Sequence, residues 1–451
     1  MKHKFLIILI SFSSTLSVAS PVEYHQKLAA IAKQASAENL QSSVQTLVNF
    51  GTRHTLSETT SSTRGIGAAR RWVKKQFDNI NKNCHHCMNV EFQGGTISAE
   101  KRIPDATDVI NVLAIKKGKT DPSRVVLISG DIDSRVTDPM NSTSDSPGAN
   151  DNASGLAAVI ESARILSKYD FNATIVFAGL SGEEQGLFGG KLLAAEAKKR
   201  GWHIIAVLNN DMIGNISGID GVIDNTHARV FSEGTRAVET AKEARIRRFT
   251  GGEVDSASRN LARYIDQLAD QYIDNLDVMM IYRLDRFGRG GHHRPFNQVG
   301  YPGVRIMEAH ENYNRQHQDI RTEKGIAYGD VISGINFPYA AKLTALNMVT
   351  LASMAWAPAP PTHVVLSGAV SKDTHLKWQQ PEHDKTKIKG YRVYWRETTS
   401  PVWQFSKDVG NVNEATLENI IIDNYFFGVS SISKDGFESP VVFPGAAGAF
   451  E

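Results

Sequence analysis

The chain lacks the features of a disulfide-stapled or nucleic-acid-binding protein. It contains only two cysteines among 451 residues, so no disulfide framework can hold its core together. Its formal net charge of +2 includes Lys2 and Lys4, and without them the chain is formally neutral. A neutral chain has no electrostatic reason to bind nucleic acid or an anionic membrane. We therefore expect neither partner.

Long hydrophobic runs are also missing. The apolar run at residues 5–10 follows Lys2 and Lys4, and residues 17–19 are small, as a signal peptidase requires. A membrane-spanning helix needs about 20 apolar residues, and no later segment is long and apolar enough. The pattern predicts a signal peptide over residues 1–19 and an exported protein, periplasmic or secreted, without a membrane span after cleavage.

The two cysteines, Cys84 and Cys87, stand three positions apart. In an exported protein this spacing usually forms a short disulfide. The alternative is a metal site that also uses His85 and His86. Four consecutive ligands cannot easily surround one tetrahedral ion, so the spacing favours the disulfide without deciding it.

Apolar strands alternate with helices over most of the chain. Two amphipathic helical stretches come first, at residues 25–50 and 62–77. Strand-like runs follow at residues 109–115, 125–129, 174–180, 204–209 and 304–307, and the clearest helices are 155–168 and 187–199. This alternation predicts an α/β fold with a mostly parallel sheet sandwiched by helices.

A stiff proline-rich linker at residues 356–362 ends this pattern. Beyond it, short runs alternate polar and apolar residues at period two, at 364–366, 376–378, 391–396 and 425–432. We therefore expect a large α/β domain over residues 20–355 and a small all-β sandwich over residues 363–451.

Acidic residues follow the ends of the predicted strands. Asp131 and Asp133 lie in SGDIDS, Glu183 and Glu184 in SGEEQGLFGG, and Asp211 in NNDMIG. The carboxyl ends of parallel strands meet at one edge of a sheet, where ligands bind. Several carboxylates at one edge repel one another unless a cation is bound. The pattern therefore predicts a metal site.

Asp151 in GANDNASG and the late His317 complete the donors of a hydrolytic two-metal site. In such sites a shared carboxylate holds two ions ~3.5–4 Å apart, which polarise a carbonyl and lower the pKa of water to about 7. Asp151 is the natural bridge, because small neighbours let the backbone approach closely. One glutamate must stay free of metal to act as a base, and we assign Glu183 as the base and Glu184 as the ligand.

These motifs, in this order, resemble the secreted di-zinc aminopeptidases of the bacterial leucyl aminopeptidase type, which share a zinc-exopeptidase fold with glutaminyl cyclases and certain carboxypeptidases. The resemblance covers residues 47–347, about two thirds of the chain. It implies a peptide substrate, Glu183 as general base, and Asp133 as the carboxylate that orients the ligand at position 131. It also implies two divalent ions, one held by Asp151, Glu184 and His317 and the other by Asp131, Asp151 and Asp211.

Two positions depart from the pattern of that family. Position 131 is normally His in GHxDS but is Asp131 here, and the usual Asp-His before Pro-Phe is His292-His293. Three carboxylates form an oxygen-rich site that suits manganese, cobalt or magnesium better than a nitrogen-containing zinc site does. We therefore expect zinc at the first position and weaker zinc selectivity at the second, unless His292 or His293 restores an imidazole ligand.

The carboxy-terminal segment resembles a fibronectin type III domain, with Tyr425 in the corner-tyrosine position. Such domains carry no chemistry of their own. The resemblance is compatible with substrate anchoring, surface attachment and stabilisation, and the sequence does not distinguish them.

The expected function is an exported metallo-aminopeptidase. A carboxypeptidase is the first alternative, because Arg286, Arg289 and Arg294 could bind a terminal carboxylate bidentately. A glutaminyl cyclase and a non-catalytic peptide-binding protein are the others. Glu183 argues against the last, since a binding site has no use for a free base beside metal ligands.

Overall fold

The structure is a computed structural model that describes residues 23–382 and 387–450. The expected signal peptide, residues 1–19, lies outside the described residues. Within those two ranges, no helix has both the length and the apolar character needed to cross a membrane.

An eight-stranded sheet lies at the centre of the described chain, in the order β1-β2-β4-β3-β5-β8-β6-β7. Its strands are β1 Asn89–Ile97, β2 Thr107–Lys116, β3 Asp121–Asp131, β4 Ala173–Leu180, β5 His203–Asn210, β6 His227–Ser232, β7 Asp277–Ile281 and β8 Gly303–Glu308. The four central strands, β4, β3, β5 and β8, are parallel to their neighbours within this group. The predicted α/β fold with a mostly parallel sheet is confirmed.

Helices cover both faces of this sheet. The helices of the described residues are α1 Gln26–Ala32, α2 Ala37–Val48, α3 Gly65–Asn83, α4 Gly155–Leu166, α5 Glu183–Gly186, α6 Phe188–Lys199, α7 Ala241–Thr250, α8 Ala257–Tyr272, α9 His293–Gln298 and α10 Phe337–Trp356. Helix α7 is the exception to this arrangement, because it buries no residue and contacts residues 446–448 near the carboxyl end of the chain. The first predicted helical stretch is two helices, because Ser36 caps α2 by accepting a hydrogen bond from the backbone N–H of Asn39.

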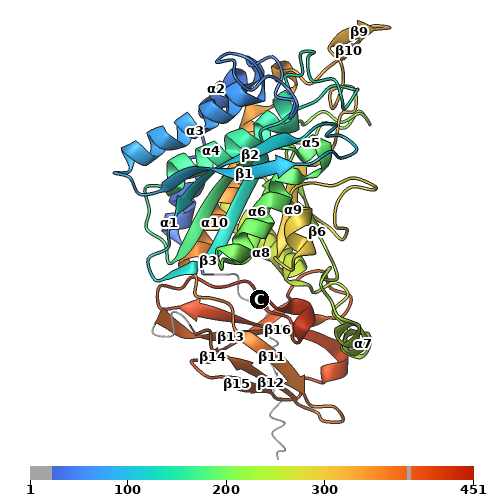
Figure 1. Ribbon diagram of the computed structural model, residues 1–451. Helices are drawn as coiled ribbons and strands as arrows, with labels where there is room; N and C mark the ends of the chain where they lie inside the picture. The colour runs from blue at the N-terminus through green and yellow to red at the C-terminus, as the bar shows by residue number, and fades with distance from the viewer. Residues whose placement is uncertain (1–22, 383–386, 451) are drawn as a thin grey trace, which may run out of the picture.

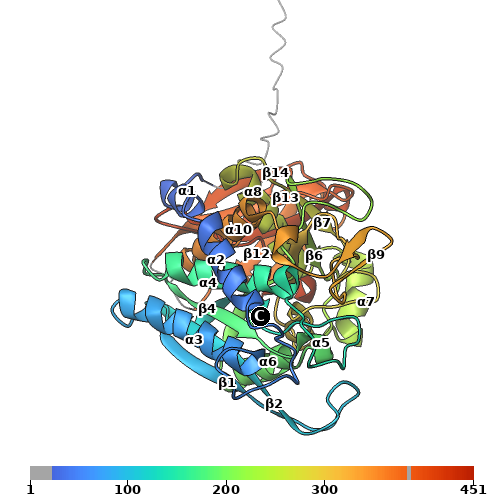
Figure 2. The same ribbon diagram turned by 90° about the horizontal axis from the view of Figure 1, so that it is seen from above.

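Successive residues of β4 pack alternately against the helix layers on the two faces of the sheet. Ile175 and Phe177 belong to the core shared with α2, α3, α4 and α10, whereas Val176 and Ala178 pack with α6 and α9. Figure 2 shows α4 and α6 on opposite sides of β4. This two-sided burial explains why the central strands are apolar at consecutive positions.

The carboxyl ends of the central strands carry the acidic motifs. Asp131 is the last residue of β3, and Asp211 directly follows β5. Glu183 and Glu184 come three and four residues after the end of β4. The sheet thus brings residues far apart in sequence to one edge, as expected.

Beyond α10 the described chain forms two three-stranded antiparallel sheets, β11-β12-β15 and β14-β13-β16. Their strands are β11 Thr362–Ser367, β12 Thr374–Gln379, β13 Ile388–Glu397, β14 Phe405–Gly410, β15 Glu414–Leu417 and β16 Tyr425–Ser433. Figure 1 shows them together at one end of the molecule, with α5 at the other end. We call residues 362–450 the carboxy-terminal module.

Cys84 and Cys87 form a disulfide directly after α3. The thiols that a metal site would need are therefore paired with each other, and the expected disulfide is confirmed.

Candidate metal centre

Asp151 lies in a tight turn, Ala149–Ser154, immediately before α4. Its backbone N–H donates a hydrogen bond of 2.7 Å to Asp330 Oδ2. The turn begins after Gly148, whose φ of 49° lies in the left-handed region that favours glycine. The small residues around Asp151 therefore allow the sharp turn that places its carboxylate at the edge of the sheet.

The two glutamates are held by Asp133. Its carboxylate accepts hydrogen bonds from the backbone N–H of Glu183 at 3.2 Å and of Glu184 at 3.1 Å, and from Thr55 Oγ1 at 3.0 Å. The family resemblance implies that Asp133 orients the ligand at position 131. Because residue 131 is a carboxylate, it offers no imidazole N–H that could donate to Asp133. The hydrogen bonds of Asp133 hold the turn of the two glutamates instead.

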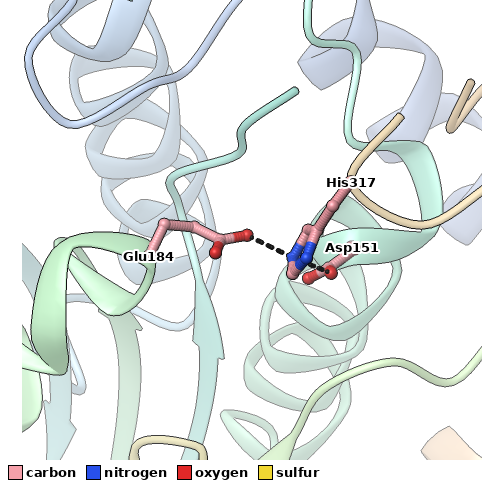
Figure 3. Close-up of side chains that lie close together, drawn as sticks. All are labelled: Asp151, Glu184 and His317. Atoms are coloured by element: carbon pink, nitrogen blue, oxygen red, sulfur yellow. Dashed lines mark ion pairs between the residues drawn. The ribbon is translucent and has the colours of Figure 1, made fainter. Parts of the chain in front are cut away.

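His317 lies in the loop after β8 and reaches both expected partners. Its Nε2 atom is 2.9 Å from Asp151 Oδ2 and 2.8 Å from Glu184 Oε1. Figure 3 shows the three side chains pointing toward one another. Asp151, Glu184 and His317 each offer a ligand atom within 4.8 Å of the other two, so the first predicted ligand set is assembled.

The protonation of these groups shows how strongly they interact. Burial lowers the pKa of His317, but Glu184 and Asp151 outweigh that effect and raise it to about 9. Burial would raise the pKa of Asp151, yet His317 holds it well below its usual range. A proton on Nε2 therefore lies between the two carboxylates, and a metal ion would compete with that proton for the same donors.

Two further residues orient these ligands and were missed by the sequence reasoning. Arg135 Nε donates to Glu184 Oε2 at 2.8 Å, and its Nη2 atom is 2.6 Å from His317 Nδ1. Gln316 Nε2 donates to Asp151 Oδ2 at 3.2 Å. Their closeness in sequence to Asp133 and His317 is the only signal that pointed to them.

A cavity of about 490 Å³ opens beside this centre. Asp151, Glu183, Glu184, Asp211 and His317 line it, together with Arg102, Arg135, Arg286, Arg289 and Arg294. No hydrogen bond or ion pair engages the side chain of Glu183 in the part of the chain that the structure describes. Burial raises the pKa of Glu183 well above its usual range, and the neighbouring carboxylates of Glu184 and Asp211 raise it further. A bound cation would lower that pKa again.

The second predicted ligand set is not assembled in this way. Asp131 forms hydrogen bonds with His292 and Asn152, and Asp211 Oδ2 lies 2.9 Å from Arg305 Nη2. His293 points away from the centre, because its Nε2 atom lies 2.8 Å from the carbonyl oxygen of Leu284. Among the described residues at this edge, only Asp151, Glu184 and His317 bring three such ligand atoms within 4.8 Å of one another.

Two carboxylates and one imidazole beside an open cavity fit a catalytic zinc ion, which takes three protein ligands and leaves a further position free. Asp131 and Asp211, two of the three residues expected to hold a second ion, are engaged by protein groups instead.

The fold and this donor set are typical of a metal-dependent enzyme. The pattern of peptidase family M28 matches residues 111–330. A protein of Leptosphaeria maculans described as a "probable zinc metalloprotease" is 42% identical over 420 residues, which cover 93% of this chain and 97% of that one. One from Pyrenophora teres f. teres with the same description is 41% identical and covers 93% and 86%. The chain belongs to peptidase family M28, a family of zinc metalloproteases.

Solved structures share the fold at low sequence identity. The Legionella pneumophila LapA aminopeptidase matches with a TM-score of 0.53 and 16% identity, over 78% of this chain and 80% of that one. A glutaminyl cyclase from Macrostomum lignano matches with a TM-score of 0.50 and 15% identity, over 74% and 94%. The same architecture therefore carries two different activities, and residues at the site have to distinguish them.

Proposed function

We propose that the protein is an exported zinc aminopeptidase that removes amino-terminal residues from peptides. The observation that carries the proposal is the convergence of Asp151, Glu184 and His317 beside Glu183, which no protein group engages among the described residues. A cavity of about 490 Å³ is large enough for the end of a short peptide and is typical of small-ligand sites. Export rests on the signal-like residues 1–19.

A zinc ion bound by these three residues would polarise the substrate carbonyl and lower the pKa of an attacking water to about 7. Glu183 would take the proton of that water and pass it to the leaving amine. Asp133 holds the backbone of Glu183 and Glu184, so the base and the ligand keep a fixed relation to each other. Arg135 and Gln316 hold the carboxylates of Glu184 and Asp151.

The test is the release of amino acids from short peptides by metal-stripped protein to which zinc, manganese or buffer is added back. Each peptide is supplied with a free and with an acetylated amino end. Zinc-dependent cleavage of the free peptides alone would support the proposal. Equal cleavage of the free and the acetylated peptides would exclude an aminopeptidase.

A carboxypeptidase is the second candidate, and the arginines of the cavity favour it. Arginine side chains attract a terminal carboxylate and repel an ammonium group. Arg286 and Arg289 already pair with Glu311, at 3.0 and 3.2 Å. Arg294 makes no ion pair with any described residue, so its guanidinium is available to bind a substrate carboxylate.

The same assay separates this candidate with peptides whose carboxyl end is amidated. A carboxypeptidase loses these substrates, and Arg294→Met should weaken binding of the free acids, seen as a higher KM, without changing cleavage of amidated peptides. A glutaminyl cyclase would release ammonia from a peptide that begins with Gln, without hydrolysis. A non-catalytic protein would bind these peptides and leave them intact.

A further inference from the structure

We propose that this chain holds one metal ion, and that the buried guanidinium of Arg305 occupies the position of the second ion that the family resemblance implies. The inference rests on the metal centre of the proposed function. It concerns how many ions are bound and does not depend on which peptide bond is cut.

Arg305 is anchored between the two strands that bound this part of the site. It lies on β8, which pairs with β5, and its side chain is fully buried. Its Nη2 atom is 2.9 Å from Asp211 Oδ2, and its Nε atom donates to the carbonyl oxygen of Asp211 at 2.5 Å. The guanidinium is thus held against both the side chain and the backbone of the expected ligand.

The other end of the guanidinium is also engaged. Arg305 Nη1 donates to the carbonyl oxygen of Gly290 at 2.8 Å and lies 3.3 Å from Asp285 Oδ2. A metal ion shared by Asp151 and Asp211 would lie close to this permanent positive charge. In a buried site, where water screens little, like charges repel strongly. Arg305 therefore disfavours a divalent cation at Asp211.

Both carboxylate oxygens of Asp131 are used by protein groups. Its Oδ1 atom is 2.6 Å from His292 Nδ1, and its Oδ2 atom accepts from Asn152 Nδ2 at 2.6 Å. Asn152 is fixed in turn, because it also donates to the carbonyl oxygen of Asn210 at 2.8 Å. An ion at Asp131 would have to break one of these buried hydrogen bonds, which is costly.

His292 is the residue through which a second ion could still bind. Its Nε2 atom is buried and has no hydrogen-bond partner among the described residues. If the His292 imidazole bound an ion together with Asp151 and Asp211, this second site would have a nitrogen ligand, as the family pattern has at position 131. The experiment therefore has to distinguish one ion from two, with His292 as the diagnostic position for the second.

Metal stoichiometry tests the inference directly. The mature chain is loaded with excess zinc, and separately with cobalt, freed of unbound metal by gel filtration, and assayed by inductively coupled plasma mass spectrometry. We expect one equivalent per chain, and a cobalt titration followed by absorbance should saturate at one. His317→Ala should lose the ion, whereas Asp211→Asn, Asp131→Asn and His292→Ala should each keep it.

Two equivalents in the wild-type chain, one of which is lost on Asp211→Asn or His292→Ala, would overturn the inference. Zero equivalents would overturn both it and the proposed function. One equivalent in a protein that cleaves no peptide would leave the inference standing and remove only the proposed function. Circular dichroism of each variant separates ligand loss from misfolding.

The role of Arg305 has its own matched pair of variants. Arg305→Gln removes the charge, and we expect cobalt binding to rise above one equivalent, because Asp211 then lacks a counter-charge. Arg305→Lys keeps a positive charge and should still bind one equivalent of cobalt. If folded Arg305→Gln protein also binds only one equivalent of cobalt, Arg305 is not what prevents a second ion from binding.

Discussion

Adjacent glutamates in α5 have different surroundings, and this difference assigns their chemistry. Glu184 is tied to His317 and Arg135, at 2.8 Å each. Glu183 has no such partner among the described residues and lines the cavity. A metal ligand has to be held in place, whereas a base has to reach a proton. The different contacts of Glu183 and Glu184 therefore support the roles that the sequence predicted for them.

Replacing the free glutamate should separate chemistry from metal binding. Glu183→Gln should lower kcat by roughly 10²–10⁴-fold, the usual contribution of a general base, while zinc content stays unchanged. Glu184→Gln should lose zinc as well as activity. Steady-state kinetics with metal analysis gives both values, and Glu196→Gln on the surface of α6 is the control. A fully active Glu183→Gln protein would remove Glu183 from the mechanism.

Asp133 is a positioning residue, because it acts through the backbone of the glutamates. In Asp133→Asn, the amide nitrogen would face a backbone N–H that needs an acceptor. Residues that support metal ligands typically contribute about 10–100-fold, and we expect a loss of that size in kcat, with a smaller change in KM. A change in melting temperature alone, with normal kcat, would mean that Asp133 is only structural.

At the scale of elements, helix α8 carries a buried acidic residue, Asp266, that forms no ion pair among the described residues. Asp266 is 9% exposed on this helix. Burial raises its pKa to about 7, and the carboxylates of Asp270 and Asp277 add to the shift. The unfolded chain loses this proton near pH 4, so between about pH 4 and 7 only the folded chain keeps it. The stability that protonated Asp266 contributes is present below pH 4 and is lost as the pH rises to about 7.

Asp266→Asn should therefore raise the melting temperature at pH 8 by a few degrees. For a chain of this size, that shift corresponds to a gain in unfolding free energy on the order of 1 kcal/mol or more. The gain should disappear toward pH 4. The measurement is a melting curve at each pH, with chelator present because the three carboxylates lie close enough to share a cation. Asp274→Asn, in the exposed loop after α8, is the control. An equal gain at every pH would contradict the titration of Asp266.

At the scale of the whole molecule, the carboxy-terminal module attaches to the end of the sheet opposite the metal centre. His203, the first residue of β5, bonds through Nε2 to the carbonyl oxygen of Phe450 at 2.7 Å. Asp211 follows the far end of the same strand. The rings of Trp356 and Phe437 lie 5.1 Å apart across the contact. This position favours stabilisation over a direct role in binding the substrate at the cavity.

A buried ion pair links the module to the α/β part. Arg396 Nη2 donates to both oxygens of Asp255, at 2.7 and 2.9 Å, and both residues are almost fully buried. Arg396→Met would leave Asp255 with one partner, Arg263, at 3.0 Å. Removing one member of a buried pair typically costs about 3–5 kcal/mol.

We therefore expect Arg396→Met to lower the melting temperature by several degrees and to leave kcat/KM at low temperature unchanged. Lys74→Met, which breaks the partly exposed pair with Asp78, should cost less than about 1 kcal/mol. Calorimetry and peptide kinetics on both variants test this. A loss of kcat/KM in a folded Arg396→Met protein would show that the module communicates with the site.

Sequence periodicity predicted the strands and helices whose burial follows one simple pattern. The central strands and α4 and α6 are confirmed, because runs of consecutive apolar residues and clear helical periodicity report burial directly. Helix α10 was missed because it is buried almost all round, which leaves no amphipathic pattern to detect. Strands β1 and β7, at the edges of the sheet, were also missed, since exposed positions interrupt their apolar character. Strand β6 was missed because the polar residues His227, Arg229 and Ser232 interrupt its apolar character.

The sequence by itself determined the α/β class, the acidic motifs at the strand ends and the resemblance to zinc peptidases, because these depend on local pattern and on motif order. Only the tertiary structure decided which acids share one centre. Asp151, Glu184 and His317 converge, whereas Asp131 pairs with His292 and Asp211 with Arg305. These partners come from β8 and from the start of α9, distant in sequence, and electrostatic pairing between buried groups depends on distances that no spacing along the chain specifies.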